Sequence, residues 1–223
     1  MLTDTAKALD SLSKCVREYK DLEATSERHL FLLWLITRGM TALGAERPIL
    51  VGGGAVELYT SVRFATGDLD IVAPDIDTCE MVLRALDFEQ PANSGHHVNR
   101  DIAALVEIHG GVLFKGEEPI ELVYRKVPLL IASPEDCIAE RLASYRRHGS
   151  SLDLLNAFLI SYHQRDRLDV EHLQARVSAL DLWDHLSAIQ CIGRNLVLNM
   201  SGTDEAAAEL IHLMKDGPAP CAF

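Results

Sequence analysis

The chain has 223 residues, of which 48% are hydrophobic and 24% charged, a composition typical of a globular protein with one good core. Its formal net charge of −12 disfavours non-specific binding to duplex nucleic acid, which needs clustered Lys and Arg to displace counterions. Five dispersed cysteines without zinc-ligand or redox-motif spacing predict reduced thiols and a cytoplasmic protein. The longest apolar run falls far short of the roughly 20 residues of a membrane span, so no membrane contact is expected.

The first part of the chain mixes helical and strand patterns. Apolar residues recur on one helical face near the N-terminus, and Pro48 precedes a short apolar strand that runs into three glycines. After the glycines, polar and apolar residues alternate as in a half-buried strand. The expected helices are 4–22, 25–39, 55–61 and 77–86, and the expected strand segments are 49–51, 68–72, 103–108 and 120–131.

The character of the sequence changes at Ser133. Ser133-Pro134-Glu135-Asp136 is a strong helix start, with a hydroxyl cap, a proline in the first turn and an acid at the third position. Helical patterns follow, interrupted near Gly149, at 165–169 and at Ser201-Gly202. The sequence predicts the α/β (α+β) class, with N-terminal helices and a small mixed-sheet core over 1–131 and a helical region over 132–223.

Asp68 and Asp70 are the first candidates for chemistry. Side chains at positions i and i+2 of a strand point to the same face, so these carboxylates converge. They repel each other unless a cation or proton lies between them, and Mg²⁺ (or Mn²⁺) with oxygen ligands suits the arrangement. Taken alone, an Asp-x-Asp strand is more often a solvated face.

Gly52, Gly53 and Gly54 follow a strand and precede a helix. Without side chains, such a turn lets a phosphate approach the backbone amides and the helix N-terminus closely. The spacing is neither a dinucleotide fingerprint nor a P-loop. A turn that packs helix on strand is the alternative explanation of the glycines alone.

Taken together, glycine turn, helix and acid-apolar-acid strand resemble the nucleotidyltransferase superfamily. Arg63 and Thr66, just before the acids, and the helix start at 133–136 resemble an uncharacterised bacterial branch related to the abortive-infection toxin-like members. The resemblance spans about 48–148. It implies a nucleotidyltransferase core in which Asp68 and Asp70 bind the metal, and in which the glycines, Arg63 and Thr66 bind the nucleotide.

The resemblance to the nucleotidyltransferase superfamily also implies a third acidic residue on a later strand. Glu107 and Glu121 both lie between apolar residues, and Glu107 is preferred because it lies on the first good strand after the 77–86 helix. Glu107 would be the third metal ligand or a general base. Arg141 is a further candidate for the triphosphate, although it could equally pair with Glu140 or Asp136.

The resemblance implies transfer of a nucleoside monophosphate from a nucleoside triphosphate to an acceptor hydroxyl, on a small molecule, a protein or a tRNA. Gly53 stands where many active members have Ser, which leaves open a catalytically degenerate binding or regulatory module. A toxin restrained by an antitoxin-like partner protein is a third interpretation. His96, His97 and His109 have no spacing typical of a transition-metal site, so none is expected.

Overall fold

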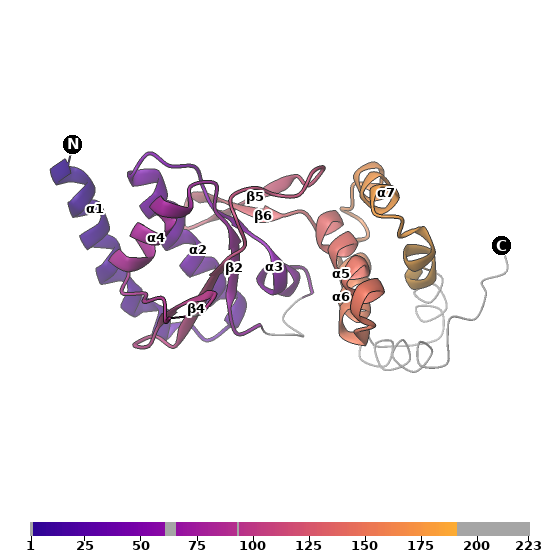
Figure 1. Cartoon of the computed structure of the whole chain (residues 1–223), viewed down its shortest axis with the longest axis horizontal. Helices are drawn as coiled ribbons and strands as arrows, with labels where there is room; N and C mark the ends of the chain where they lie inside the picture. The colour runs from indigo at the N-terminus through magenta and orange to yellow at the C-terminus, as the bar shows by residue number, and fades with distance from the viewer. Residues whose placement is uncertain (1, 61–65, 93, 191–223) are drawn as a thin grey trace. The chain divides into compact units, whose positions relative to one another are not determined.

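The computed structural model describes residues 2–60, 66–92 and 94–190. The chain divides into two compact units, Met1–Ser133 and Pro134–Phe223, two residues beyond the boundary expected from the sequence. The first unit contains a six-stranded mixed sheet and the second is helical, so the predicted α/β class is confirmed (Figure 1). Across these described ranges, no helix has both the length and the apolar character that crossing a bilayer requires.

Helices and strands alternate in the first unit. Its helices are α1 (Leu2–Cys15), the 3₁₀ helix η1 (Val16–Asp21), α2 (Thr25–Ala42), α3 (Gly52–Tyr59) and α4 (Ile76–Ala85). Its strands are β1 (Ile49–Leu50), β2 (Leu69–Val72), β3 (His96–Asn99), β4 (Ala104–Ile108), β5 (Pro119–Tyr124) and β6 (Val127–Ala132).

The sheet has the strand order β3-β4-β2-β1-β6-β5. β2 is parallel to β4 and β1 is parallel to β6, whereas the other neighbours are antiparallel. Because β1 and β2 run in opposite directions, the end of β1 lies beside the start of β2. The glycines that follow β1 are thereby brought next to the acids that open β2.

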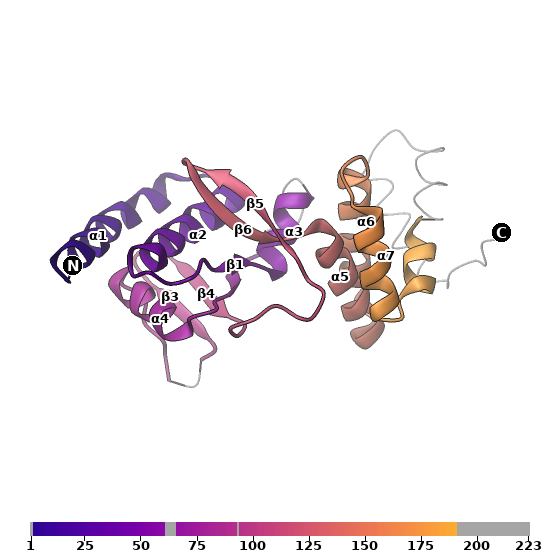
Figure 2. The same ribbon diagram turned by 90° about the horizontal axis from the view of Figure 1, so that it is seen from above.

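The core lies on one side of the central strands. Leu69 and Ile71 of β2 are fully buried, as are Phe31 and Leu35 of α2. Figure 1 shows α2 and α4 on one side of β2 and α3 on the other, and Figure 2 shows the same unit from above. Each buried aliphatic or aromatic side chain stabilises the fold by about 1.5–3 kcal/mol. The alternate residues of β2 are left on the face away from this core.

Three elements differ from the sequence expectation. Residues 120–131 form a hairpin, β5–β6, whose turn residues Arg125 and Lys126 have φ values of 47° and 66°. The short strand β3 was not expected, because His96–Asn99 contains one aliphatic residue; it pairs with β4 and bridges to Glu89 through Val98. Helix α3 begins at Gly52 rather than at 55, so the glycines form its first turn.

As far as residue 190, the second unit contains α5 (Pro134–His148), α6 (Ser151–Gln164), α7 (Val170–Ala179) and a further helical stretch at 183–190. Its helices end where the sequence indicates, at Gly149 with φ of +67° and at 165–169. Ser150 and Asp169 cap α6 and α7 by accepting backbone N–H bonds. The expected break at Ser201-Gly202 lies outside the described residues.

Candidate functional site

Asp68 and Asp70 lie on the face of β2 that does not meet the core. Their side chains are 29% and 14% exposed, whereas Leu69 and Ile71 between and after them are buried. The Val51 N–H donates to the Asp70 carbonyl oxygen at 3.0 Å, and this hydrogen bond holds the start of β2 beside the end of β1. The period-2 pattern of the strand therefore sets both carboxylates on one accessible face.

Glu107 lies directly beside Asp70 in the sheet. The two residues are paired in the parallel β2–β4 register, and the Glu107 side chain is 30% exposed. Glu121, the other candidate for the third acid, lies on edge strand β5 and pairs with Arg47 at 2.7 Å. The structure thus brings Glu107, and not Glu121, to the aspartate pair.

The glycine turn packs against the same carboxylates. Gly52 has φ of +58°, and a Cβ atom at this position would overlap the carboxylate of Asp70. The Gly53 N–H donates to Asp70 Oδ2 at 3.2 Å, and a Cβ on Gly53 would stand 2.8 Å from Thr66 Oγ1. A Cβ on Gly54 would be 3.0 Å from Leu50 Cδ1. Side chains are thus excluded on all sides of this turn.

Each aspartate has one oxygen held by a neighbouring donor. The Thr66 hydroxyl donates to Asp68 Oδ1 at 2.7 Å, and the Gly53 amide holds Asp70 Oδ2. The remaining oxygens, Asp68 Oδ2 and Asp70 Oδ1, are directed toward histidines. Thr66 therefore contacts the site, while Arg63, which the sequence also assigns to it, lies outside the described residues.

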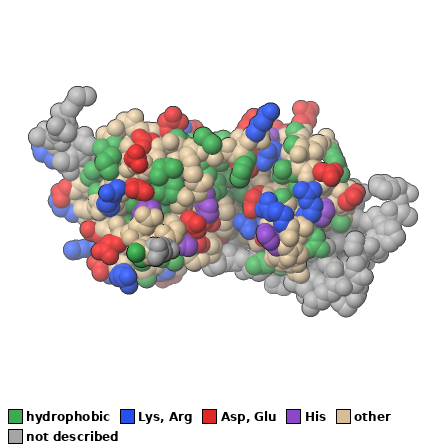
Figure 3. Space-filling view, in the orientation of Figure 1, with side chains coloured by type: hydrophobic (Ala, Val, Ile, Leu, Met, Phe, Trp, Pro, Cys, Tyr) green, Lys and Arg blue, Asp and Glu red, His purple; other side chains and the backbone are tan. Residues whose placement is uncertain are grey.

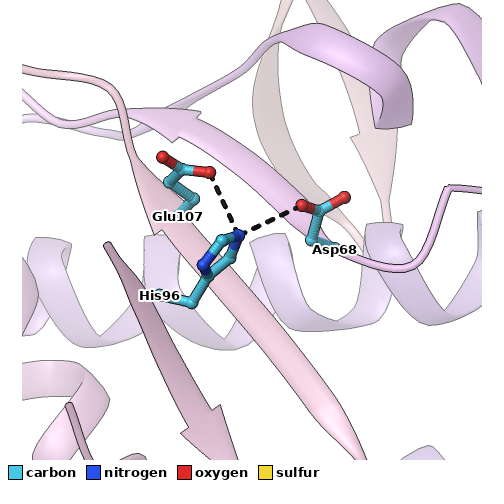
Figure 4. Close-up of side chains that lie close together, drawn as sticks. All are labelled: Asp68, His96 and Glu107. Carbon is cyan, nitrogen blue, oxygen red and sulfur yellow. Dashed lines mark ion pairs between the residues drawn. The ribbon is translucent and has the colours of Figure 1, made fainter. Parts of the chain in front are cut away.

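Two histidines complete the cluster of carboxylates. His96 Nε2 lies 3.4 Å from Asp68 Oδ2 and 3.2 Å from Glu107 Oε2 (Figure 4). His109 Nε2 lies 2.9 Å from Asp70 Oδ1 and 3.9 Å from Glu107 Oε2. Figure 3 shows histidine and acidic side chains together on the surface of the α/β unit.

The spacing of His96, His97 and His109 predicts no metal site, yet two of the three histidines lie at the acids. His96 is directly opposite Glu107 in the antiparallel β3–β4 register, so it shares that face of the sheet. His97, the next residue, points the other way and is 5% exposed. His109 follows Glu107 by two residues, and this same-face spacing was the one local signal in the sequence.

A buried acid–base pair lies behind the glycine turn. His29 Nδ1 of α2 is 3.2 Å from Glu57 Oε2 of α3, and both side chains are almost fully buried. Burial lowers the pKa of His29, against the opposing influence of Asp68 and Asp70. Burial likewise raises the pKa of Glu57, although backbone N–H groups of Thr66 and Ser26 oppose this shift. The pair joins α2 to the helix that carries the glycines.

Arg141 belongs to the helical unit, where acidic side chains engage it. Its guanidinium lies 3.0 Å from Asp153 Oδ1 and 3.0 Å from Glu140 Oε2. Burial favours a lower pKa for Arg141, but Glu140 and Asp153 outweigh it and raise the pKa. The alternative that the sequence left open for this residue, an ion pair with Glu140, is present.

The site therefore offers three carboxylates and two imidazoles at the start of β2. Asp68, His96 and Glu107 form one group whose ligand atoms lie within 4.8 Å of one another, and Asp70, Glu107 and His109 form another. Such groups can hold divalent cations, and oxygen ligands fit Mg²⁺ or Mn²⁺. Comparisons of the chain with protein-family models, with curated proteins and with solved structures found no match.

Proposed function

We propose that the protein is a metal-dependent nucleotidyltransferase, which moves a nucleoside monophosphate from a nucleoside triphosphate to an acceptor hydroxyl. The observation that carries the proposal is the row formed by the glycine turn, Asp70 and Glu107 across neighbouring strands. Asp68 adds a second carboxylate on the same face of β2. Three carboxylates beside a helix N-terminus are suited to a cation and a phosphate chain together.

In this proposal, Asp68, Asp70 and Glu107 are the ligands of Mg²⁺ or Mn²⁺. The bound ion would neutralise negative charge on the transferred phosphoryl group and on pyrophosphate. Gly52, Gly53 and Gly54 contribute no side chains of their own to the first turn of α3, so a phosphate could approach its backbone beside Asp70 and Thr66. Thr66 and the Gly53 amide orient the two aspartates. Glu107 is the third ligand or the base toward the acceptor hydroxyl.

Arg63 and Arg141 remain candidates for contacts with the nucleotide. The acceptor is a small molecule, a protein hydroxyl or a tRNA, and an antitoxin-like protein is a further candidate partner. A cytoplasmic location suits a reaction that uses nucleoside triphosphates, and the cysteines at 15, 79 and 137 are free thiols, as a reducing compartment favours.

The test is to incubate the full-length chain with each of the four nucleoside triphosphates in the presence of Mg²⁺ or Mn²⁺. Pyrophosphate release and label transferred to the protein or to added tRNA are measured. Metal-dependent release with at least one nucleotide is expected, and it should disappear in Asp70→Asn. Metal-dependent nucleotide binding without release would favour the binding or regulatory module, and absence of both would reject the proposal.

A further inference from the structure

We propose that His96 and His109 are metal ligands, and that the site binds a first-row transition-metal ion in preference to Mg²⁺ at two positions that share Glu107. This inference rests on the proposed function in one respect only, namely that it concerns the same carboxylates. Metal binding is measured without nucleotide, so the two proposals fail independently.

The first position is formed by Asp68, His96 and Glu107. Figure 4 shows the three side chains directed toward one another, Asp68 from the residue just before β2, His96 from β3 and Glu107 from β4, with His96 Nε2 between the two carboxylates. All three side chains are about one third exposed, so an ion can reach them from solvent. Ligand atoms around one ion at about 2.1 Å lie at most about 4.2 Å apart, and this group needs little adjustment to reach that spacing.

The second position is formed by Asp70, His109 and Glu107, on the neighbouring part of the sheet. His109 Nε2 is closer to Asp70 than to Glu107, at 2.9 Å against 3.9 Å. Glu107 belongs to both groups and has two oxygens, so it can bridge two ions. The two aspartates lie two residues apart on one strand face, and each serves one position.

The supporting hydrogen bonds favour metal ligation. In each aspartate, one oxygen accepts from a neighbouring donor, Thr66 Oγ1 or the Gly53 amide, and the other oxygen faces a histidine. Donors of this kind orient carboxylate ligands in metal sites and fix which oxygen is offered to the ion. Within residues 2–60, 66–92 and 94–190, no Lys or Arg forms an ion pair with these three acids. The cluster can thus offer both carboxylate oxygens and imidazole nitrogens to a cation.

The imidazoles decide which cation is favoured. Mg²⁺ prefers an all-oxygen shell and retains its waters, whereas imidazole nitrogen suits Mn²⁺, Fe²⁺, Co²⁺ and Zn²⁺ increasingly well. One nitrogen at each position therefore shifts the preference of the site away from Mg²⁺. Mn²⁺ is the probe of choice because it is paramagnetic and resembles Mg²⁺ in its affinity for carboxylates.

The experiment titrates the full-length protein with Mn²⁺ and with Mg²⁺, without nucleotide, and records pulsed electron paramagnetic resonance of the bound Mn²⁺. Two Mn²⁺ per chain are expected, bound at least about tenfold more tightly than Mg²⁺, with nitrogen hyperfine coupling from directly bound imidazole. His96→Gln and His109→Gln should each weaken one of the two Mn²⁺ sites by at least about tenfold and leave Mg²⁺ binding nearly unchanged. The control is His148→Gln, because His148 is exposed on α5 of the other unit.

The wild-type spectrum alone decides the central claim, so the test survives a variant that fails to fold. Bound Mn²⁺ without nitrogen coupling, or Mn²⁺ affinity that both histidine variants leave unchanged, would overturn the inference. Nitrogen-coupled Mn²⁺ with no turnover of any nucleotide would support the inference and reject the proposed function. Metal-dependent turnover of a nucleotide, together with bound Mn²⁺ that shows no nitrogen coupling, would do the reverse.

Discussion

Gly52 stands against the carboxylate of Asp70 so closely that any Cβ atom at position 52 would overlap it. The same glycine has φ of +58°, in the left-handed region that other residues adopt at a cost of about 1–2 kcal/mol. Two separate constraints, on backbone conformation and on space, therefore meet at one residue of the proposed site.

Gly52→Ala separates these constraints when it is compared with Gly44→Ala. Gly44 has φ of +77° but no atom within 4 Å of a built Cβ, so its substitution carries only the conformational cost. We expect both variants to lose about 1–2 kcal/mol in urea unfolding. Only Gly52→Ala should also lose metal affinity, because the added methyl group displaces Asp70. Equal metal affinity in the two variants would contradict this role of Gly52.

Asp70→Asn should leave the fold intact while the proposed transfer activity falls by about a hundredfold or more, because several kcal/mol of charge stabilisation is lost and 1.4 kcal/mol is about tenfold. Asn keeps an oxygen that can accept from the Gly53 amide, and it removes repulsion from Asp68 and Glu107. Without metal, the variant should melt at or above the wild-type temperature. Asp10→Asn on exposed α1 is the matched control. A clearly lower melting temperature for Asp70→Asn would mean that Asp70 is structural.

The buried pair of His29 and Glu57 is predicted to be strongly coupled. Burial shifts both pKa values toward the neutral forms, so removal of one partner leaves a buried polar group unpaired, and His29→Leu and Glu57→Leu should each cost about 1–3 kcal/mol. The double variant should cost less than the sum of the two by at least about 1 kcal/mol. The exposed pair Glu80–Arg84 is the control, with an expected coupling of about 0.5 kcal/mol or less. Additive costs at His29 and Glu57 would show that the two do not interact.

Cys79 should resist thiol reagents that label Cys15. Burial raises the pKa of Cys79 to about 12, so at pH 8 about one molecule in ten thousand carries the reactive thiolate. Peptide mapping after alkylation at pH 8 measures this difference, since Cys15 is partly exposed. The folded thiol also holds its proton more tightly than the unfolded one, so the free energy of unfolding should fall as pH rises from about 9 toward 12. Equal labelling of both cysteines would contradict the burial.

Random duplex DNA should not bind tightly at near-physiological salt, because the chain has 33 acidic and only 21 basic residues and its net charge repels a polyanion. The basic cluster of α5 is also engaged internally, since Arg141 pairs with Asp153 and Arg146 donates to the carbonyl oxygens of Leu180 and Asp181. An electrophoretic shift with duplex DNA and with bulk tRNA tests this. Salt-sensitive binding to arbitrary duplex would contradict the prediction, and selective tRNA binding would identify the acceptor class.

The acids were accessible to sequence reasoning because their placement follows from local alternation. Asp68 and Asp70 share a face by strand geometry alone. The helix break at Gly149 was predictable because glycine readily adopts the positive φ that is found there. The pairing of Asp70 with Glu107 needed one further step, the parallel register of β2 and β4. The resemblance implied a third acid on a later strand, and of the two flanked acids, Glu107 and Glu121, the sequence favoured Glu107 without fixing its register.

The remaining features depend on contacts between distant segments. His96 reaches the acids only because β3 pairs with β4, and its sequence carries little strand character. The β5–β6 turn has positive φ at Arg125 and Lys126, where a sequence rule looks for Asn or Gly. Arg125 is held there by tertiary contacts, since it pairs with Glu18 and stacks on Phe31. No window of local sequence contains these partners.

Because β3 contains two adjacent histidines, the register in which it pairs with β4 determines which of the two imidazoles lies beside the acids. A shift of one residue would turn His96 into the core and present His97 to the acids, so either frame offers an imidazole. Asn99 selects between them, because it is buried, donates to the Leu86 carbonyl and accepts from the Asp101 and Ile102 amides. The imidazole beside Glu107 is thus fixed in part by the buried amide side chain of Asn99, three residues from His96, whose hydrogen bonds go to Leu86, Asp101 and Ile102.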